Sequence, residues 1–120
     1  MARDLYYTGP MERVGSGVEQ GIVKVENLNE SESVEVRVRL FELNGTRTRL
    51  ETLDFTVDPN SSSGSDGELT DFGTSLEYDV EVRIITDGDL NSVFVSYWGK
   101  DSNGDIVPSH RVVFEEMHRL

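Results

Sequence analysis

Alternation of apolar and charged residues with a period of two constrains this chain more than any other feature. The run 34–40, Val-Glu-Val-Arg-Val-Arg-Leu, places an aliphatic side chain at every second position and a charge between. The run 78–84 repeats this pattern. Because successive side chains of a strand point to opposite faces, both runs predict strands with one buried side. The run 93–98 is apolar on both faces, which favours the middle of a sheet.

Turn residues separate these runs at short intervals. Asn44-Gly45 lies between two alternating segments, and Asp87-Gly88 and Asn103-Gly104 follow later runs. Asn, Asp and Gly tolerate positive φ, so such pairs are typical of hairpins. Weaker strands are expected over 21–28, 47–57 and 111–117. The spacing predicts an all-β fold, an antiparallel two-sheet sandwich of the immunoglobulin-like or jelly-roll type with about 7 to 8 strands.

Two segments interrupt this rhythm. Residues 1–17 contain several glycines and one short apolar patch, Leu5, Tyr6 and Tyr7. We expect a flexible N-terminal arm over 1–17, disordered alone and a strand when paired, followed by a sandwich domain over 18–120. Residues 58–67 are rich in Ser, Gly and Asp, with almost nothing to bury, and are predicted to form a mobile loop.

Composition limits the possible functions. A chain of 120 residues is long enough for one domain, and the absence of cysteine removes thiol catalysis and disulfide scaffolds. The net charge of −12 argues against nucleic acid as a partner, since phosphate backbones are bound by cationic groups. No apolar leader or membrane-spanning run is seen, so no signal peptide or membrane span is expected and synthesis is cytoplasmic.

The candidate catalytic and metal-binding groups of the sequence also have structural interpretations. Asp101, Asn103 and Asp105 match the first three ligand positions of a calcium loop, but Ile106 and Val112 stand where that loop needs Gly and Glu. A plain hairpin turn is the favoured interpretation. No serine elbow or phosphate-binding glycine loop occurs in the sequence. We therefore expect no enzymatic activity and no cofactor.

The single tryptophan offers a candidate contact surface. Alternation places Trp98 on the same face as Phe94, opposite Val93, Val95 and Tyr97. Core packing is the ordinary role of such a tryptophan. If the sheet is covered on one side only, however, one of these two faces points outward, and an exposed Phe94/Trp98 strip would mark a surface for a partner or another subunit.

Two segments resemble known families. The run 21–30, Gly-Ile-Val-Lys-Val-Glu-Asn-Leu-Asn-Glu, followed by 34–40, resembles the opening strands of immunoglobulin-like adhesion and cell-surface modules. The closing run 98–114 is similar to that of small β-sandwich proteins of spore-forming Firmicutes. Spore-appendage subunits share this plan of a sandwich behind an N-terminal arm. They commonly carry cysteines in the arm, whereas this chain has none, so the resemblance implies non-covalent association.

These observations predict a non-enzymatic structural or interaction domain that forms homo-oligomers or binds a protein partner at a cell or spore surface. The expected mechanism is strand addition, in which the arm from Asp4 to Val14, or an open sheet edge, pairs with a neighbouring subunit. The predicted interaction residues are Leu5, Tyr6, Tyr7, Phe94 and Trp98. The alternative is a carbohydrate- or calcium-binding module that uses the acidic loops and an exposed Trp98.

Overall fold

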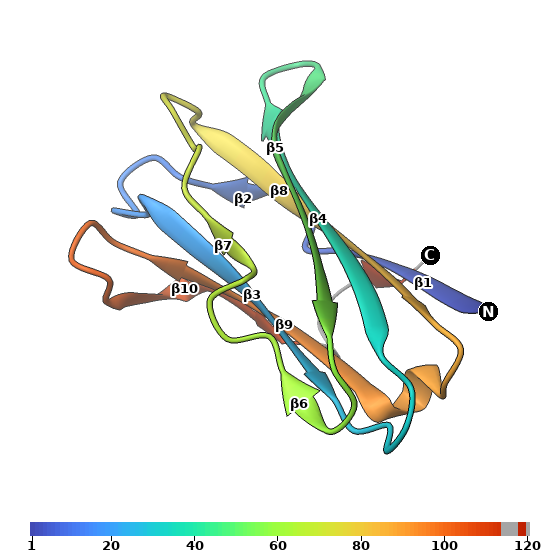
Figure 1. Cartoon of the computed structure of the whole chain (residues 1–120). Coiled ribbons are helices and arrows are strands. Elements are labelled where there is room, and N and C mark those ends of the chain that lie inside the picture. Colours follow the sequence, from blue (N-terminus) through green and yellow to red (C-terminus); the bar gives the residue numbers. More distant parts are fainter. Residues whose placement is uncertain (114–117, 120) are drawn as a thin grey trace.

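The computed structural model describes residues 1–113 and 118–119, and these form two antiparallel β-sheets packed face to face (Figure 1). Sheet A has the strand order β11-β1-β8-β4-β5, with the short β2 also paired to β8. Sheet B has the order β10-β9-β3-β6, with β7 also paired to β3. The predicted fold class, an all-β sandwich of two antiparallel sheets, is confirmed.

Seven strands of six or more residues make up most of the described structure. They are β1 (Ala2–Tyr7), β3 (Gln20–Asn27), β4 (Val34–Leu43), β5 (Arg47–Val57), β8 (Glu77–Thr86), β9 (Val93–Lys100) and β10 (Ile106–Val113). Four two-residue strands complete the sheets: β2 (Met11–Glu12), β6 (Ser61–Ser62), β7 (Glu68–Leu69) and β11 (His118–Arg119). A single turn of 3₁₀ helix, η1 (Leu90–Ser92), precedes β9. Residues 114–117 of the last predicted strand lie outside the described residues.

The core lies between the sheets and follows the alternation in the sequence. On β4, Val34, Val38 and Leu40 are fully buried, and the four alternate residues of β8 from Tyr78 to Ile84 are fully buried too. On β9 the buried side chains are Val93, Val95 and Tyr97. The residues between them point away from the core. Burial of one face therefore fixes the register of each strand.

Two of the three predicted turns form hairpins. Asn44-Gly45 joins β4 to β5, with Gly45 at a φ of 93°, and Asn103-Gly104 joins β9 to β10. Asp87-Gly88 differs, because it leads from β8 in sheet A to β9 in sheet B. Its backbone is held by Asn29, whose Oδ1 accepts the N–H of Asp89 at 2.9 Å. The turn residues indicate where the chain turns, whereas the apolar face of the next strand decides which sheet that strand joins.

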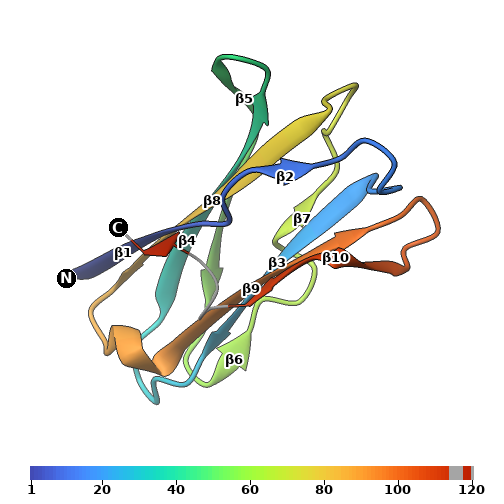
Figure 2. The same ribbon diagram turned by 180° about the vertical axis from the view of Figure 1, so that it is seen from behind.

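The N-terminal segment differs from the predicted flexible arm. β1 lies along β8 over its whole length, with Ala2 opposite Thr86 and Tyr7 opposite Glu81 (Figure 2). Tyr6 is buried, and β1 also pairs with β11. The physical reason is its own alternation, which places Asp4 and Tyr6 on the inner side. The boundary predicted between an arm (1–17) and a sandwich domain (18–120) would therefore separate β1 and β2 from sheet A, to which they belong.

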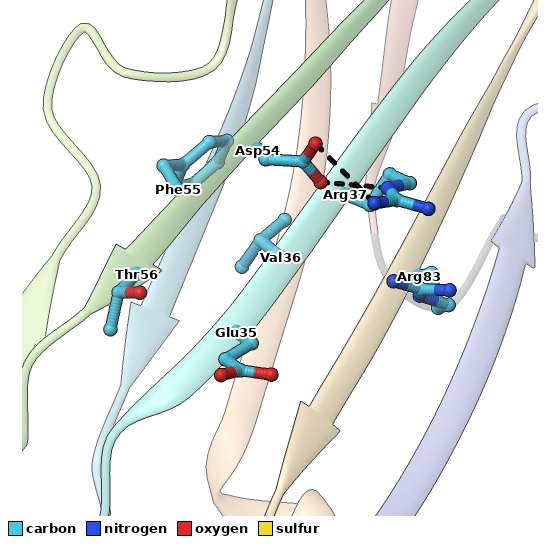
Figure 3. Close-up of a pocket in the computed structure, with 7 residues that line it drawn as sticks. All are labelled: Glu35, Val36, Arg37, Asp54, Phe55, Thr56 and Arg83. Carbon is cyan, nitrogen blue, oxygen red and sulfur yellow. Dashed lines mark hydrogen bonds and ion pairs between the residues drawn. The ribbon is translucent and has the colours of Figure 1, made fainter.

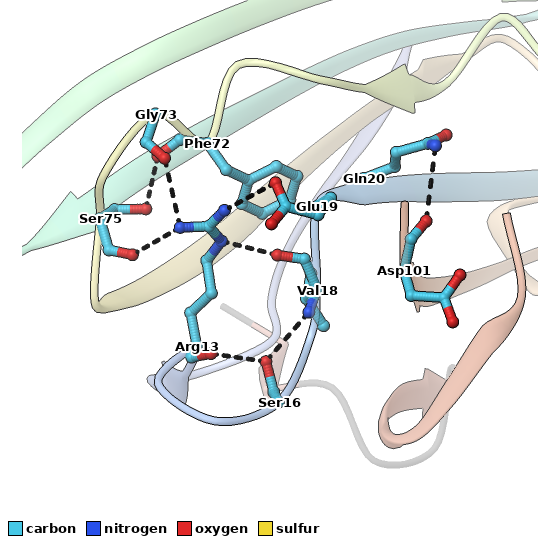
Figure 4. Close-up of polar contacts among 9 residues, drawn as sticks. All are labelled: Arg13, Ser16, Val18, Glu19, Gln20, Phe72, Gly73, Ser75 and Asp101. Atoms are coloured by element: carbon cyan, nitrogen blue, oxygen red, sulfur yellow. Dashed lines mark hydrogen bonds and ion pairs between the residues drawn. The ribbon is translucent and has the colours of Figure 1, made fainter. Parts of the chain in front are cut away.

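Arg13 holds the rest of this segment to the sandwich. Its Nε donates to the carbonyl of Val18 at 2.7 Å, and Nη1 donates to the carbonyl of Ser75 at 2.9 Å (Figure 4). The guanidinium also lies over the ring of Phe72. One side chain thus connects the loop after β2 to the loop before β8.

The segment 58–67 also differs from its prediction as a mobile loop. Ser63 is buried and exchanges two hydrogen bonds with β3, since its N–H donates to Val25 O at 2.9 Å and its Oγ accepts from Val25 N at 3.0 Å. The carbonyl of Gly67 accepts from Val23 N. Short polar side chains let this backbone lie close to β3, so the segment covers the edge of sheet B.

No helix long and apolar enough to cross a membrane occurs in the part of the chain that the structure describes.

A pair of glycines makes room for two buried side chains at one end of sheet B. Gly21 of β3 lies directly opposite Gly99 of β9. A Cβ on Gly21 would overlap the ring of Tyr97, and a Cβ on Gly99 would lie 2.7 Å from the Cβ of His110. Both side chains therefore occupy space that only glycine leaves open.

We expect Gly21→Ala to lower the free energy of unfolding by about 1–3 kcal/mol, because the added methyl group must displace a fully buried tyrosine. Urea denaturation followed by circular dichroism measures this. Lys24→Ala on the same strand is the matched control, since Lys24 is exposed. Equal stability of the Gly21→Ala protein and the wild type would contradict the steric argument.

Candidate functional site

The outer edge of β5 carries no further strand among the described residues, and the backbone N–H groups of Thr70 and Asp71 donate to its Glu51 side chain. β5 is an 11-residue strand at the end of sheet A, and among the described residues it pairs only with β4. Its far end is anchored, because the buried Asn27 donates from Nδ2 to the carbonyl of Val57 at 3.3 Å. The strand is therefore held in place while one row of its backbone groups faces outward.

The other three sheet edges are covered or irregular. β1 carries β11, with Tyr6 opposite Arg119 and Tyr7 opposite His118. β3 is covered by β6 and β7. β10 contains Pro108, which has no N–H to donate, and its register shifts between Ile106 and Arg111. Such devices hinder pairing with another chain. β5 contains no proline, and its one register shift relative to β4 leaves Leu50 as an extra residue between Arg49 and Glu51.

The outer face of sheet A carries a network of charged and aromatic side chains beside this edge. The guanidinium of Arg47 lies 3.4 Å from the ring centroid of Phe41 and donates to Asp79 at 3.3 Å. It also reaches Glu81 at 3.5 Å and lies over Tyr7. Burial raises the pKa of Asp79, and Arg47 acts against that shift. Arg47 thus connects the start of β5 to β8 and β1.

A second ion pair lies further along β5. Arg37 Nε donates to Asp54 Oδ1 at 2.7 Å across the β4–β5 pair (Figure 3). The hydrogen bond from Arg37 is the main factor that lowers the pKa of Asp54, and Arg83 and Arg39 contribute to it. Asp54 is exposed and Arg37 is half-buried at the surface, so the contribution of this ion pair to stability is small.

The structure separates the predicted interaction residues of β1. Tyr6 is 2% exposed, and its hydroxyl donates to Asp4 at 2.9 Å, so its side chain belongs to the core. Leu5 and Tyr7 lie half-buried on the outer face of sheet A. Their neighbours there are the charged side chains of β8, since Leu5 stands opposite Arg83.

Phe94 and Trp98 lie together on the outer face of sheet B, as the alternation predicts. Phe94 is 44% exposed and borders a shallow hollow of about 390 Å³. Trp98 is half-buried, its indole N–H donates to Ser96 Oγ at 2.8 Å, and Arg111 lies 4.9 Å from its ring centroid. The indole therefore offers less free ring surface than an open sugar-binding platform needs.

The acidic turn has a structural explanation. Asp101 Oδ1 accepts the N–H groups of Asn103 at 2.9 Å and Asp105 at 3.0 Å, an arrangement that stabilises the β9–β10 hairpin. No cluster of three or more His, Cys, Asp or Glu side chains suited to a metal ion occurs within residues 1–113. Calcium binding by Asp101, Asn103 and Asp105 stays a prediction without support from this geometry.

Sequence reasoning missed a buried polar cluster between the sheets. The hydroxyl of Tyr78 lies 3.0 Å from that of Tyr97 and 2.6 Å from Nδ1 of His110. Burial raises the pKa of Tyr78 to about 12 and lowers the pKa of His110, while a backbone hydrogen bond with Glu12 opposes the histidine shift. When the imidazole of His110 is neutral and carries its proton on Nε2, every polar group of the cluster has a hydrogen-bond partner. Gly21 and Gly99, which leave room for Tyr97 and His110, were the sequence signal that could have indicated this cluster.

This cluster makes stability depend on pH. A base whose pKa is lowered by folding binds its proton more readily in the unfolded chain. The stabilisation from neutral His110 is therefore complete above the unfolded pKa of about 6.5, and it is lost as the pH falls below that value. We expect the free energy of unfolding to decrease between pH 7 and pH 5.

His110→Gln separates the contribution of the imidazole from that of the carboxylates, among them Asp79, whose pKa is raised by burial. The variant should be less stable at pH 7.5, and its stability should change less than that of the wild type between pH 7 and pH 5. Urea denaturation at each pH gives both quantities. Identical pH dependence in the two proteins would exclude His110 as the titrating group.

Comparisons with known proteins support the fold and give no family. No family model matches the chain, and no curated protein matches it. Among solved structures, the chain is similar to the Anabaena sensory rhodopsin transducer, with a TM-score of 0.52, 9% identity, and coverage of 87% of this chain and 93% of that one. It is also similar to Thermotoga maritima 1070, with a TM-score of 0.48 and 10% identity over 99% of this chain and 89% of that one.

At such identities the likeness concerns the fold alone. Neither structure bears on the resemblance to β-sandwich proteins of spore-forming Firmicutes, which stays a prediction.

Proposed function

We propose that this protein is a non-enzymatic structural domain that self-associates by strand addition at the edge of β5. The observation that carries the proposal is the open edge, since an 11-residue strand has one hydrogen-bonded neighbour, β4, in the described part of the chain. An extended edge of this kind can pair its backbone groups with another strand.

The geometry favours the edge over the N-terminal arm as the site of addition. β1 already pairs with β8 at six positions and with β11 at two. To add to a neighbouring subunit, residues 4–14 would first have to leave these partners and expose Tyr6. β5 needs no such rearrangement.

A second copy of the chain fits this edge electrostatically. β5 carries Arg47 and Arg49 near its start and Asp54 near its end. Antiparallel pairing of two β5 strands places the start of one beside the end of the other, so opposite charges approach each other. The two copies would extend sheet A into one continuous sheet around a two-fold axis.

A structural role at a cell or spore surface accords with this mode of assembly, because strand addition joins subunits without cysteines. The carbohydrate and calcium alternatives have less support, since Trp98 is covered by Arg111 and Asp101 is occupied by its own turn.

The double substitution Thr52→Lys/Thr56→Lys tests the proposal. Both threonines are exposed on β5, so the fold should be kept, while like charges gather at the junction of two paired copies. We expect the wild type to elute as a dimer or larger species. The variant should show a dissociation constant raised at least about tenfold, equivalent to 1.4 kcal/mol. Size-exclusion chromatography with light scattering over a dilution series measures this.

Ser61→Lys/Ser109→Lys is the matched control, because it adds the same charge to the two edge regions of sheet B. This variant should assemble like the wild type. A wild type that has the mass of one chain at all concentrations would refute self-association. Weakening of assembly by the control alone would move the interface to sheet B.

A further inference from the structure

Arginines are concentrated on the outer face of sheet A. Six of the eleven basic residues of the chain lie there, namely Arg3, Arg37, Arg39, Arg47, Arg49 and Arg83. The same face carries six of the 23 acidic residues, namely Glu12, Glu35, Asp54, Glu77, Asp79 and Glu81. This face is therefore balanced in charge, whereas the whole chain has a net charge of −12.

Two of these arginines oppose each other directly. Arg37 of β4 and Arg83 of β8 are cross-strand partners, and both side chains project from the same face (Figure 3). Like charges at directly opposite positions destabilise a sheet. A bound anion between them would convert this repulsion into attraction.

The neighbouring carboxylates do not neutralise the cluster. Asp54 is bound to Arg37, and Glu81 is shared between Arg47 at 3.5 Å and Arg39 at 4.0 Å. The side chain of Arg83 forms no ion pair or hydrogen bond with any described residue. Nε of Arg39 is buried and has no hydrogen-bond partner within the described structure. A buried donor without an acceptor is costly.

The surface beside these arginines is hollowed. Arg83 lines two adjoining depressions, one of about 280 Å³ that includes Arg37 and Asp54, and one of about 420 Å³ that includes Arg3 and Glu81. Either depression is large enough for a phosphate or sulfate group with its water. The planar guanidinium forks match the oxygens of such groups.

We propose that Arg37 and Arg83 form a binding site for a compact dianionic oxyanion, a phosphate or sulfate group, with Arg3 at its rim. The group is compact because the charge of −12 on the whole chain repels a long polyanion, while local attraction dominates within a Debye length of about 8 Å at physiological salt. The first hollow extends onto β5 at Asp54, Phe55 and Thr56, whereas the second is lined by β1 and β8 alone and does not depend on pairing at the β5 edge.

Titration with inorganic phosphate and with sulfate, at ionic strength held constant with sodium chloride, tests the proposal. The readout is the Nε–H resonance of each arginine by NMR. We expect saturable shifts at Arg37 and Arg83, and weaker binding of acetate, which carries one charge. O-phosphoserine in place of phosphate distinguishes a phosphate ester on a larger molecule from the free ion.

Arg83→Gln should weaken phosphate binding at least tenfold. Arg49→Gln, which removes one charge from the same face outside the hollows, should bind like the wild type. Glu35→Gln should bind more tightly, because Glu35 lines the first hollow and forms no ion pair among the described residues. Thermal melting verifies that each variant is folded. Linear, non-saturating shifts that are equal in the wild type and Arg83→Gln would overturn the site.

Discussion

The apolar contact between the two sheets is the constraint on which the rest of this structure depends. Each of the long strands at its centre buries one row of side chains, and these rows are almost entirely aliphatic or tyrosine. A shift of one residue in any strand would turn that row to solvent and bury charges. Register, strand orientation and the position of every outward side chain therefore follow from this single contact.

The polar cluster of Tyr78, Tyr97 and His110 is the exception inside that contact. Its groups come from both sheets, with Tyr78 on β8 and the other two on β9 and β10. Buried hydroxyl and imidazole groups must find hydrogen-bond partners, and here they find each other across the interface. The apolar rows bring the sheets together, and this cluster helps define how they are aligned at the end marked by Gly21 and Gly99.

Sequence patterns were sufficient for the part of the fold that depends on neighbouring residues. Alternation identified β4, β8 and β9, and the Asn-Gly pairs located two hairpins. Strand order depends on contacts between distant residues and left no such signal. The sequence placed Arg37 and Arg83 on outward faces, yet their adjacency requires β4 to lie next to β8, a pairing across some 46 positions of chain. The same limit explains why β1 was assigned to an arm and why the Ser-rich segment was predicted to be mobile.

Both proposed surfaces belong to sheet A because the two sheets terminate differently. Sheet B ends on one side in short polar strands that cover β3, and on the other in a strand interrupted by Pro108 and a register shift. Sheet A ends on one side in β1, which carries β11, and on the other in the long β5, which has one register shift relative to β4. The face between these ends is charged rather than apolar, so it is suited to a small charged ligand, while the apolar side chains that β5 brings to an interface are the half-buried Leu50, Leu53 and Phe55. Backbone pairing along β5, rather than apolar contact between faces, is consequently the mode of association that this distribution of side chains favours.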